Sequence, residues 1–145
     1  NLSNKTFLIS GSSKGIGLKI SERLLSEGAN VIITGRSKNL IKNQFNKLYS
    51  KFRLKVAYTN GDIKSNLVLK KIKNLVKKRW KKLDGIIANA GSVKTNIRSF
   101  SSEKDFYWYQ KNNFLTAFKF VNYFLDDIKK NKGLKNPIIL KDLYV

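Results

Sequence analysis

The sequence predicts an α/β fold: a doubly wound parallel sheet with strand order 3-2-1-4-5 and helices on both faces, in one domain spanning residues 1–145. Short apolar runs bounded by polar residues, which suit buried parallel strands, alternate with longer runs whose apolar residues recur at helical spacing. In addition, a glycine-rich turn joins the first short run to the first long one, as in a βαβ unit.

The first expected strand is Thr6–Ile9, and the first expected helix begins at Ile16 and ends at Glu27-Gly28, where glycine stops it. Val31–Thr34 is the second expected strand. Between the first strand and its helix, the run Ser10–Gly17 carries glycines at 11, 15 and 17. They permit a tight turn, close approach of peptide N–H groups to a phosphate, and close packing of helix on strand. The turn is therefore predicted to bind an anion, with an ordinary surface loop as the alternative.

The middle of the chain continues the alternation. Ser37 is predicted to cap a helix whose apolar stripe runs from Leu40 to Phe52, and residues 54–59 form the third expected strand. Residues 66–82 predict a helix that packs on the sheet with its many lysines in water, followed by a fourth strand at residues 84–88.

The last third of the chain predicts one long helix and the start of a fifth strand. Apolar and aromatic residues at helical spacing run from Phe106 to Ile128, after a polar loop over residues 92–101. The aromatic content of this helix suggests burial on two sides. Asn136–Leu140 begins like the next strand.

Several motifs resemble those of the short-chain dehydrogenase/reductase family. Ser10-Gly11-x-x-x-Gly15-Ile16-Gly17 resembles the family's TGxxxGIG fingerprint, with serine in place of threonine. Ala88-Asn89-Ala90-Gly91 resembles its NNAG motif, with alanine in place of the first asparagine. Asn113-Phe114-Leu115-x-x-Phe118 resembles the helix that carries the family's catalytic asparagine. The segments Gly35-Arg36-Ser37 and Asn60–Ile63 match in the same order.

The resemblance covers essentially the whole chain but only the first, cofactor-binding part of the family's domain. It implies a Rossmann-type, three-layer αβα sandwich whose sheet is incomplete at its C-terminal edge. The implied activity is hydride transfer between a nicotinamide cofactor and a carbonyl or alcohol substrate. The residues that it assigns to cofactor binding are Ser10, Gly11, Ser13, Lys14, Gly15, Ile16, Gly17, Arg36, Asp62, Ile63, Asn89, Ala90 and Gly91.

The end of the second strand determines which cofactor is expected. An acidic side chain there would bind the ribose 2′-OH and repel a 2′-phosphate. Gly35 occupies that place and Arg36 follows, so room and positive charge are available for the phosphate, with Lys14 as a second cation. We therefore expect NADP(H) rather than NAD, the alternative being that Arg36 is a solvated loop cation. By resemblance, Asp62 would hold the adenine amino group, and capping of the next helix is its alternative role.

By resemblance, Asn113 joins a serine, a tyrosine and a lysine in a proton relay, with a structural buried amide as the alternative. Phe118 fixes this register against the neighbouring Asn112. The family places its serine and its Tyr-x-x-x-Lys after the fifth strand, whereas this chain has no serine after Ser102. One Tyr-x-x-x-Lys, Tyr107 to Lys111, precedes Asn113 in the same helix and is rejected for that reason. We expect a C-terminally truncated enzyme, inactive alone and homo-oligomeric when full length.

Charge and composition bound the remaining function classes. Thirty Lys and Arg against nine Asp and Glu give a net charge of +21, which raises nucleic acid or an acidic membrane as a partner. Lysines predominate and are spread along every helical segment, which indicates solvated helix faces, so nucleic acid is not the expected partner. A non-catalytic dinucleotide-binding module and, less favoured, a nucleic-acid-binding domain are the alternatives.

The chain contains no cysteine and no histidine, which excludes disulfides and the usual zinc ligands, and no metal is expected. No run reaches the roughly 18 apolar residues of a membrane span, and the first residues do not resemble a secretory signal. We therefore expect a cytoplasmic protein that does not bind membranes.

Overall fold

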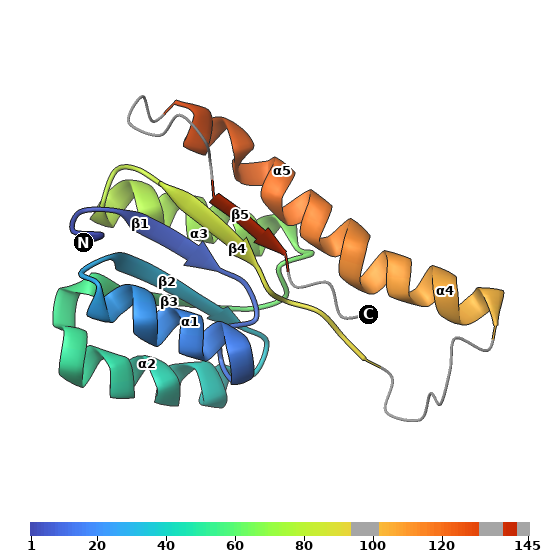
Figure 1. Ribbon diagram of the computed structural model, residues 1–145, viewed down its shortest axis with the longest axis horizontal. Helices are drawn as coiled ribbons and strands as arrows, with labels where there is room; N and C mark the ends of the chain where they lie inside the picture. Colours follow the sequence, from blue (N-terminus) through green and yellow to red (C-terminus); the bar gives the residue numbers. More distant parts are fainter. Residues whose placement is uncertain (94–101, 131–137, 142–145) are drawn as a thin grey trace.

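A computed structural model of the chain describes residues 1–93, 102–130 and 138–141. Its centre is a parallel sheet of five strands in the order β3-β2-β1-β4-β5, as the sequence predicts (Figure 1). In the register of the central strands, Leu8 pairs with Ile32 on one side and with Ile86 on the other. The strands are β1 (Thr6–Ile9), β2 (Asn30–Gly35), β3 (Val56–Asn60), β4 (Gly85–Ala88) and β5 (Ile138–Lys141).

Helices cover both faces of the sheet and give three layers (Figure 1). The lower helices of the view are α1 (Gly15–Ser26) and α2 (Lys38–Phe52), and the opposite face carries α3 (Asn66–Arg79) and α5 (Leu115–Lys129). Helix α4 (Glu103–Tyr109) precedes α5, and a π-helical turn over Gln110–Phe114 joins the two. The expected long helix is therefore present, interrupted by one wide turn.

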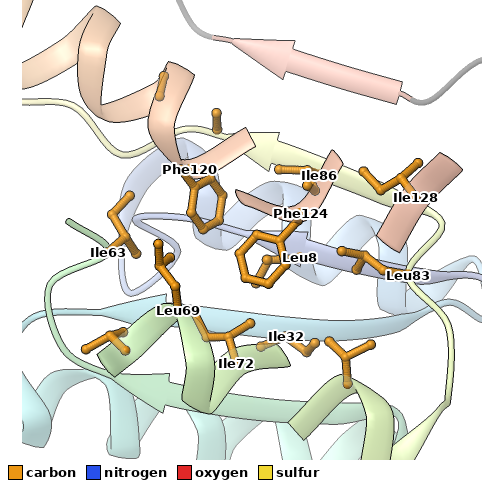
Figure 2. Packing of buried hydrophobic residues seen from close by; sticks show 14 of the residues in the cluster. Leu8, Ile32, Ile63, Leu69, Ile72, Leu83, Ile86, Phe120, Phe124 and Ile128 are labelled. Carbon is orange, nitrogen blue, oxygen red and sulfur yellow. The ribbon is translucent and has the colours of Figure 1, made fainter. Parts of the chain in front are cut away.

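Strand β1 is buried on both faces, as expected for a central parallel strand. Alternate residues of β1 belong to two hydrophobic cores, one on each face of the sheet. Phe7 and Ile9 pack with residues of α1 and α2, whereas Leu8 packs with residues of α3 and α5. On the α3 and α5 side, Phe120 and Phe124 meet edge to face, with ring centroids 5.7 Å apart, above the central strands (Figure 2). These two cores fix the sheet and thereby the edge at which its strands end.

The start of β3 and the end of α3 differ from prediction by a few residues, and the predicted cap of α2 is confirmed. The expected third strand loses its start, because the chain makes a 3-10 turn over Arg53–Lys55 after Arg53 adopts a φ of +50°. Helix α3 ends at Arg79, short of residue 82, because Lys81 takes a φ of +66° and turns the chain toward β4. Ser37 caps α2 as predicted, since its Oγ accepts the Leu40 N–H at 3.3 Å.

The long helix is expected to be buried on two sides, and within the single chain one of these sides is covered. Only one side of α5 faces the sheet, and α4 projects beyond it (Figure 1). The residues left exposed, with 39 to 61% of their surface accessible, are Phe106, Tyr107, Phe114, Leu115 and Phe118.

A buried carboxylate, which the sequence analysis does not single out, ties together the starts of β1 and β4. Asp84 is 1% exposed, and its Oδ2 accepts the Thr6 N–H at 2.8 Å while its own N–H donates to the Thr6 carbonyl at 2.8 Å. The ammonium groups of Lys5 and Lys82 lie 3.6 and 3.7 Å from Oδ1. The carboxylate therefore sets the alignment of two neighbouring strands.

Candidate functional site

A cleft of about 390 Å³ opens at the carboxyl edge of the sheet. It lies where the chain leaves β1, β2, β3 and β4, which is where open parallel sheets bind ligands. Eleven of the thirteen predicted cofactor-binding residues line it, the exceptions being Ser10 and Gly17. The lining residues are Gly11, Ser13, Lys14, Gly15, Ile16, Thr34, Gly35, Arg36, Gly61, Asp62, Ile63, Lys64, Asn89, Ala90, Gly91, Ser92, Val93, Asn112 and Thr116.

The glycines of the turn after β1 have different local roles. Gly11 and Gly15 have φ values of +63° and +56°, a conformation that side chains disfavour. A Cβ at Gly11 would lie 2.8 Å from the Ala90 Cα, and one at Gly17 would lie 2.5 Å from the Asn89 Nδ2. A Cβ at Gly15 would meet nothing within 4 Å. Gly11 and Gly17 therefore allow the turn to pack against the loop after β4, whereas Gly15 leaves the backbone open to the cleft.

The N-terminus of α1 faces this turn without a protein cap. Lys14 at the N-cap position makes no capping hydrogen bond, and the first turn of the helix holds no acidic side chain. The first N–H groups of a helix have no partner inside the helix and carry the positive end of its dipole. An anion in the cleft would satisfy these groups, which fits the predicted phosphate site.

Asn89, at the end of β4, holds the turn in place. Its Nδ2 donates to the carbonyl oxygens of Ser10 and Gly11 at 3.2 and 3.0 Å. The Ser10 hydroxyl accepts the Ala90 N–H at 2.9 Å, so a second side chain links the turn after β1 to the segment after β4. The Oδ1 of Asn89 is buried and has no hydrogen-bond partner among the described residues. An unpaired buried acceptor beside the cleft is the kind of atom that a bound ligand satisfies.

Ser12 joins the turn to the end of β2. Its hydroxyl donates to the Ile9 carbonyl at 2.9 Å and accepts the Thr34 N–H at 2.8 Å. Just beyond, a Cβ on Gly35 would lie 3.0 Å from the side chain of Ser13, so a larger residue would crowd the cleft. Arg36 follows Gly35 with an exposed side chain that lines the cleft.

The loop after β3 is attached to the loop after β2. The Asn60 Nδ2 donates to the Arg36 carbonyl at 2.8 Å, and the Gly61 N–H donates to the Gly35 carbonyl at 3.0 Å. Asp62 does not cap α3, which corrects one of its two expected roles. Its Oδ1 accepts the Lys64 N–H at 2.9 Å and closes a local turn, while the N-cap position of α3 belongs to Ser65.

Asn113, the predicted catalytic residue, lies in the π-helical turn and binds the segment after β4. Its Oδ1 accepts the Ser92 N–H at 2.8 Å, and its Nδ2 donates to the Ser92 carbonyl at 3.1 Å. Asn113 is not among the residues that line the cleft, whereas its neighbour Asn112 is. Tyr107 is 61% exposed and lies outside the lining, so the rejected Tyr107–Lys111 pair does not reach the cleft.

Sequence reasoning missed several lining residues, of which Thr34, Lys64, Ser92, Asn112 and Thr116 carry polar side chains. The sequence placed Thr34 in a strand, and Lys64 did not stand out among the many lysines, so neither was assigned to the site. Among the lining residues the charged side chains are three cations, Lys14, Arg36 and Lys64, and one carboxylate, Asp62. The cleft therefore has a net positive charge that favours an anionic ligand.

Comparison with known proteins agrees with this geometry. The family model described as short chain dehydrogenase matches residues 5–135. The 3-oxoacyl-(acyl-carrier-protein) reductase of Rickettsia bellii is 35% identical over 107 residues, covering 73% of this chain and 41% of that protein. A short-chain dehydrogenase/reductase of unknown function from Caenorhabditis elegans, solved with cofactor, is 26% identical with a TM-score of 0.78, covering 91% of this chain and 51% of that one.

A third comparison is with an alcohol dehydrogenase from the archaeon Thermococcus sibiricus, solved in complex with 5-hydroxy-NADP. It is 25% identical with a TM-score of 0.75, covering 93% of this chain and 57% of that one. The chain thus spans about half the length of the proteins that it matches. In the part of the chain that the structure describes, no helix is long and apolar enough to cross a bilayer.

Proposed function

The chain belongs to the short-chain dehydrogenase family, and we propose that it forms the dinucleotide-binding part of an NADP(H)-dependent oxidoreductase acting on a carbonyl or alcohol substrate. The observation that carries this proposal is the uncapped N-terminus of α1, which faces a cationic cleft at the carboxyl edge of the sheet. A pyrophosphate there would accept hydrogen bonds from the amides at Gly15 and Ile16. The bound nicotinamide would give or take the hydride.

The preference for NADP(H) rests on the loop after β2. An NAD-binding site would place a carboxylate there to accept hydrogen bonds from the ribose 2′-OH. Gly35 instead leaves space beside the Ser13 side chain, and the Arg36 guanidinium can bind a 2′-phosphate through two parallel hydrogen bonds. Lys14 adds a second positive charge at the same cleft. None of the ion pairs among the described residues neutralises Lys14 or Arg36.

We further propose that the 145-residue chain alone binds the dinucleotide without turning over substrate. Proton transfer to or from the substrate oxygen requires an acid placed within hydrogen-bond reach. Among the described lining residues there is no tyrosine, and Asn113 is engaged by the backbone of Ser92. In a longer protein, Asn113 would take part in the proton relay that the family resemblance implies. Turnover by this chain alone would contradict the proposal, and a longer form that binds dinucleotide without turnover would favour the non-catalytic module.

The cofactor assignment predicts a reversal of preference in the variant Arg36→Asp. We expect NADPH to raise the melting temperature of the unmodified chain more than NADH does, because only NADPH carries the 2′-phosphate. In Arg36→Asp, NADH should give the larger shift, since a carboxylate repels that phosphate and binds the ribose hydroxyls. Thermal unfolding with NADPH or NADH at equal concentration measures which nucleotide gives the larger shift in melting temperature, for the unmodified chain and for the variant.

Lys47→Asp is the matched control, because it makes the same change in charge on an exposed face of α2 outside the cleft lining. It should leave the NADPH preference unchanged. Equal shifts with both nucleotides in the unmodified chain would contradict the NADP assignment. No shift with either nucleotide would contradict dinucleotide binding itself.

We also propose that the whole protein is a homo-oligomer that uses the exposed aromatic face of α4, the π-helical turn and α5. Monomeric proteins seldom expose contiguous apolar patches of this kind, and such patches mark interaction surfaces. Phe114 and Phe118 stack there with ring centroids 6.4 Å apart, each more than half exposed.

A further inference from the structure

A hydrogen bond between distant segments closes one wall of the cleft. The Lys64 ammonium donates to the Asn112 Oδ1 at 2.9 Å, and the two residues are 48 positions apart in the chain. Lys64 lies on the loop between β3 and α3, and Asn112 lies in the π-helical turn between α4 and α5. Both residues line the cleft.

The fold explains why these segments meet. Strands β3 and β4 are separated by β2 and β1, but α3 and α5 lie on the same face of the sheet and share one core. Farther along the two helices, the Lys73 ammonium and the Asp127 carboxylate lie 2.8 Å apart. The Lys64–Asn112 bond is a second link, at the ends of α3 and α5 that face the cleft.

Both partners of this bond are held in orientation by local contacts. The Asn112 Nδ2 donates to the Trp108 carbonyl at 2.8 Å, which turns Oδ1 toward Lys64. The Lys64 N–H donates to the Asp62 Oδ1 at 2.9 Å, which fixes the backbone from which the lysine extends. The result is a lysine whose flexible stem ends at a defined position.

The ammonium retains the capacity to bind a ligand. It carries three N–H donors, and the bond to Asn112 uses one of them. None of the ion pairs among the described residues involves Lys64. A cation that is held in place, has no partner carboxylate and lines a cleft is suited to bind an anionic or hydrogen-bond-accepting ligand.

We propose that Lys64 binds the adenosine half of the dinucleotide and that Asn112 is the residue that positions it. This inference rests on the proposed function. The adenosine half is indicated because the loop that carries Lys64 is hydrogen-bonded through Asn60 and Gly61 to Gly35 and Arg36, where the ribose phosphate is expected. Lys64 thereby joins Lys14 and Arg36 as a third cation for the nucleotide.

The test uses 2′,5′-ADP, which is the adenosine half of NADP without nicotinamide, and measures its dissociation constant by calorimetry on the full chain. Lys64→Met keeps most of the stem and removes the charge, so we expect affinity to fall by about 3- to 10-fold. Lys64→Arg should keep more affinity than Lys64→Met. Asn112→Leu should weaken binding by roughly 2- to 3-fold, because it removes a contact that positions Lys64 and leaves the ammonium itself in place, with no further loss in the Lys64→Met background.

Lys70→Met is the matched control, because Lys70 is exposed on α3 and does not line the cleft. It should bind 2′,5′-ADP like the unmodified chain. A purely structural role for the pair would lower the melting temperature of the unliganded protein and leave affinity unchanged. If Lys64→Met does not melt cooperatively, Lys64→Gln takes its place.

The outcomes separate this inference from the proposed function. If the unmodified chain binds 2′,5′-ADP and Lys64→Met binds it equally well, the inference is overturned and the proposed function stands. Additive losses in the double variant would overturn the positioning role of Asn112. If the unmodified chain does not bind 2′,5′-ADP, the proposed function fails as well.

Discussion

Gly15 and Gly17 lie two residues apart and perform different tasks. Gly15 needs its positive φ but faces open space, whereas Gly17 is buried against Asn89 and the Gly11 carbonyl. A fingerprint in the sequence treats both as one motif. The structure separates the residue that opens the backbone to a ligand from the residue that allows the helix to approach the sheet.

We predict that Gly17→Ala destabilises the protein more than Gly15→Ala. A methyl group at Gly17 would lie 2.5 Å from the Asn89 Nδ2 and 2.7 Å from the Gly11 oxygen, and such overpacking costs about 1–3 kcal/mol. At Gly15 the cost should be about 1 kcal/mol, from backbone strain alone. Urea denaturation measures both losses. A Gly17→Ala protein as stable as the original would show that the packing described for this turn is wrong.

Asn113 has a structural function that can be measured apart from catalysis. Its amide makes both hydrogen bonds to the backbone of Ser92, so we predict that Asn113→Leu lowers the free energy of unfolding by about 2 kcal/mol, roughly 1 for each bond. Asn113→Asp keeps an acceptor for the Ser92 N–H and loses the donor, so its loss should be smaller. Asn122→Leu, on an exposed part of α5, is the control in the same denaturation experiment. No loss in Asn113→Leu would exclude the anchoring role.

At the scale of elements, α3 and α5 are joined by an ion pair as well as by their shared core. Lys73 and Asp127 lie 2.8 Å apart, and the Lys73 ammonium also lies 5.7 Å from the centre of the Tyr123 ring. The hydrogen bond to Asp127 raises the pKa of Lys73 above its ordinary value, and the charge of Asp127 acts in the same direction. Partial burial of the ammonium opposes this shift.

We predict that Lys73→Met lowers the free energy of unfolding at neutral pH by about 0.5 kcal/mol, the modest value expected for a partly exposed pair. Because the pKa of Lys73 is raised in the folded protein, its contribution is complete below the unfolded pKa. It is lost as the pH rises through the folded value. The stability difference between Lys73→Met and the original should therefore narrow only in the alkaline range. Lys70→Met, which removes an exposed ammonium of α3 outside the Lys73–Asp127 pair, is the control in the same experiment.

The elements that sequence patterns predict well are those governed by burial. The described strands and helices lie within a few residues of their predicted positions, because apolar runs and helical periodicity reflect packing directly. The π-helical turn at Gln110–Phe114 was not predicted, since the apolar periodicity continues through it. Aromatic content alone does not indicate what covers the second side of α4 and α5, which is exposed in the single chain.

At the scale of the whole molecule, the exposed aromatic face and the high net charge act in opposite directions. The charge of +21 opposes association of two copies at low salt, while burial of Phe114 and Phe118 would favour it. Salt screens the repulsion and leaves apolar burial intact. Association should therefore increase with ionic strength.

We predict that the double variant Phe114→Lys and Phe118→Lys is less associated than the original at every salt concentration. Sedimentation equilibrium between low and high salt gives the comparison. Leu54→Lys and Leu67→Lys together form the control, because these residues are 69 and 64% exposed outside α4 and α5. An original protein that stays monomeric across the whole salt range would argue against the oligomeric proposal.

In the candidate site, the sequence predicts the residues that follow strand ends, and it does not predict contacts between distant segments. The motifs located the glycine-rich turn, the NNAG-like segment and Arg36 because each follows the end of a strand, and all strands of a parallel sheet end at one edge. Lys64 and Asn112 were not identified as a pair, since their contact depends on how α3 and α5 lie beside each other. No local pattern reports a contact across 48 residues.

The two hydrogen bonds from Asn89 to the turn after β1 bear on the kinetics of recognition. They cross-link the turn to the neighbouring strand before any nucleotide arrives, so little chain ordering is left for the encounter itself. When the binding site is preformed, diffusion and long-range electrostatic attraction set the association rate. Stopped-flow mixing should then show one fast phase whose rate rises linearly with nucleotide concentration, without the plateau of a slow rearrangement.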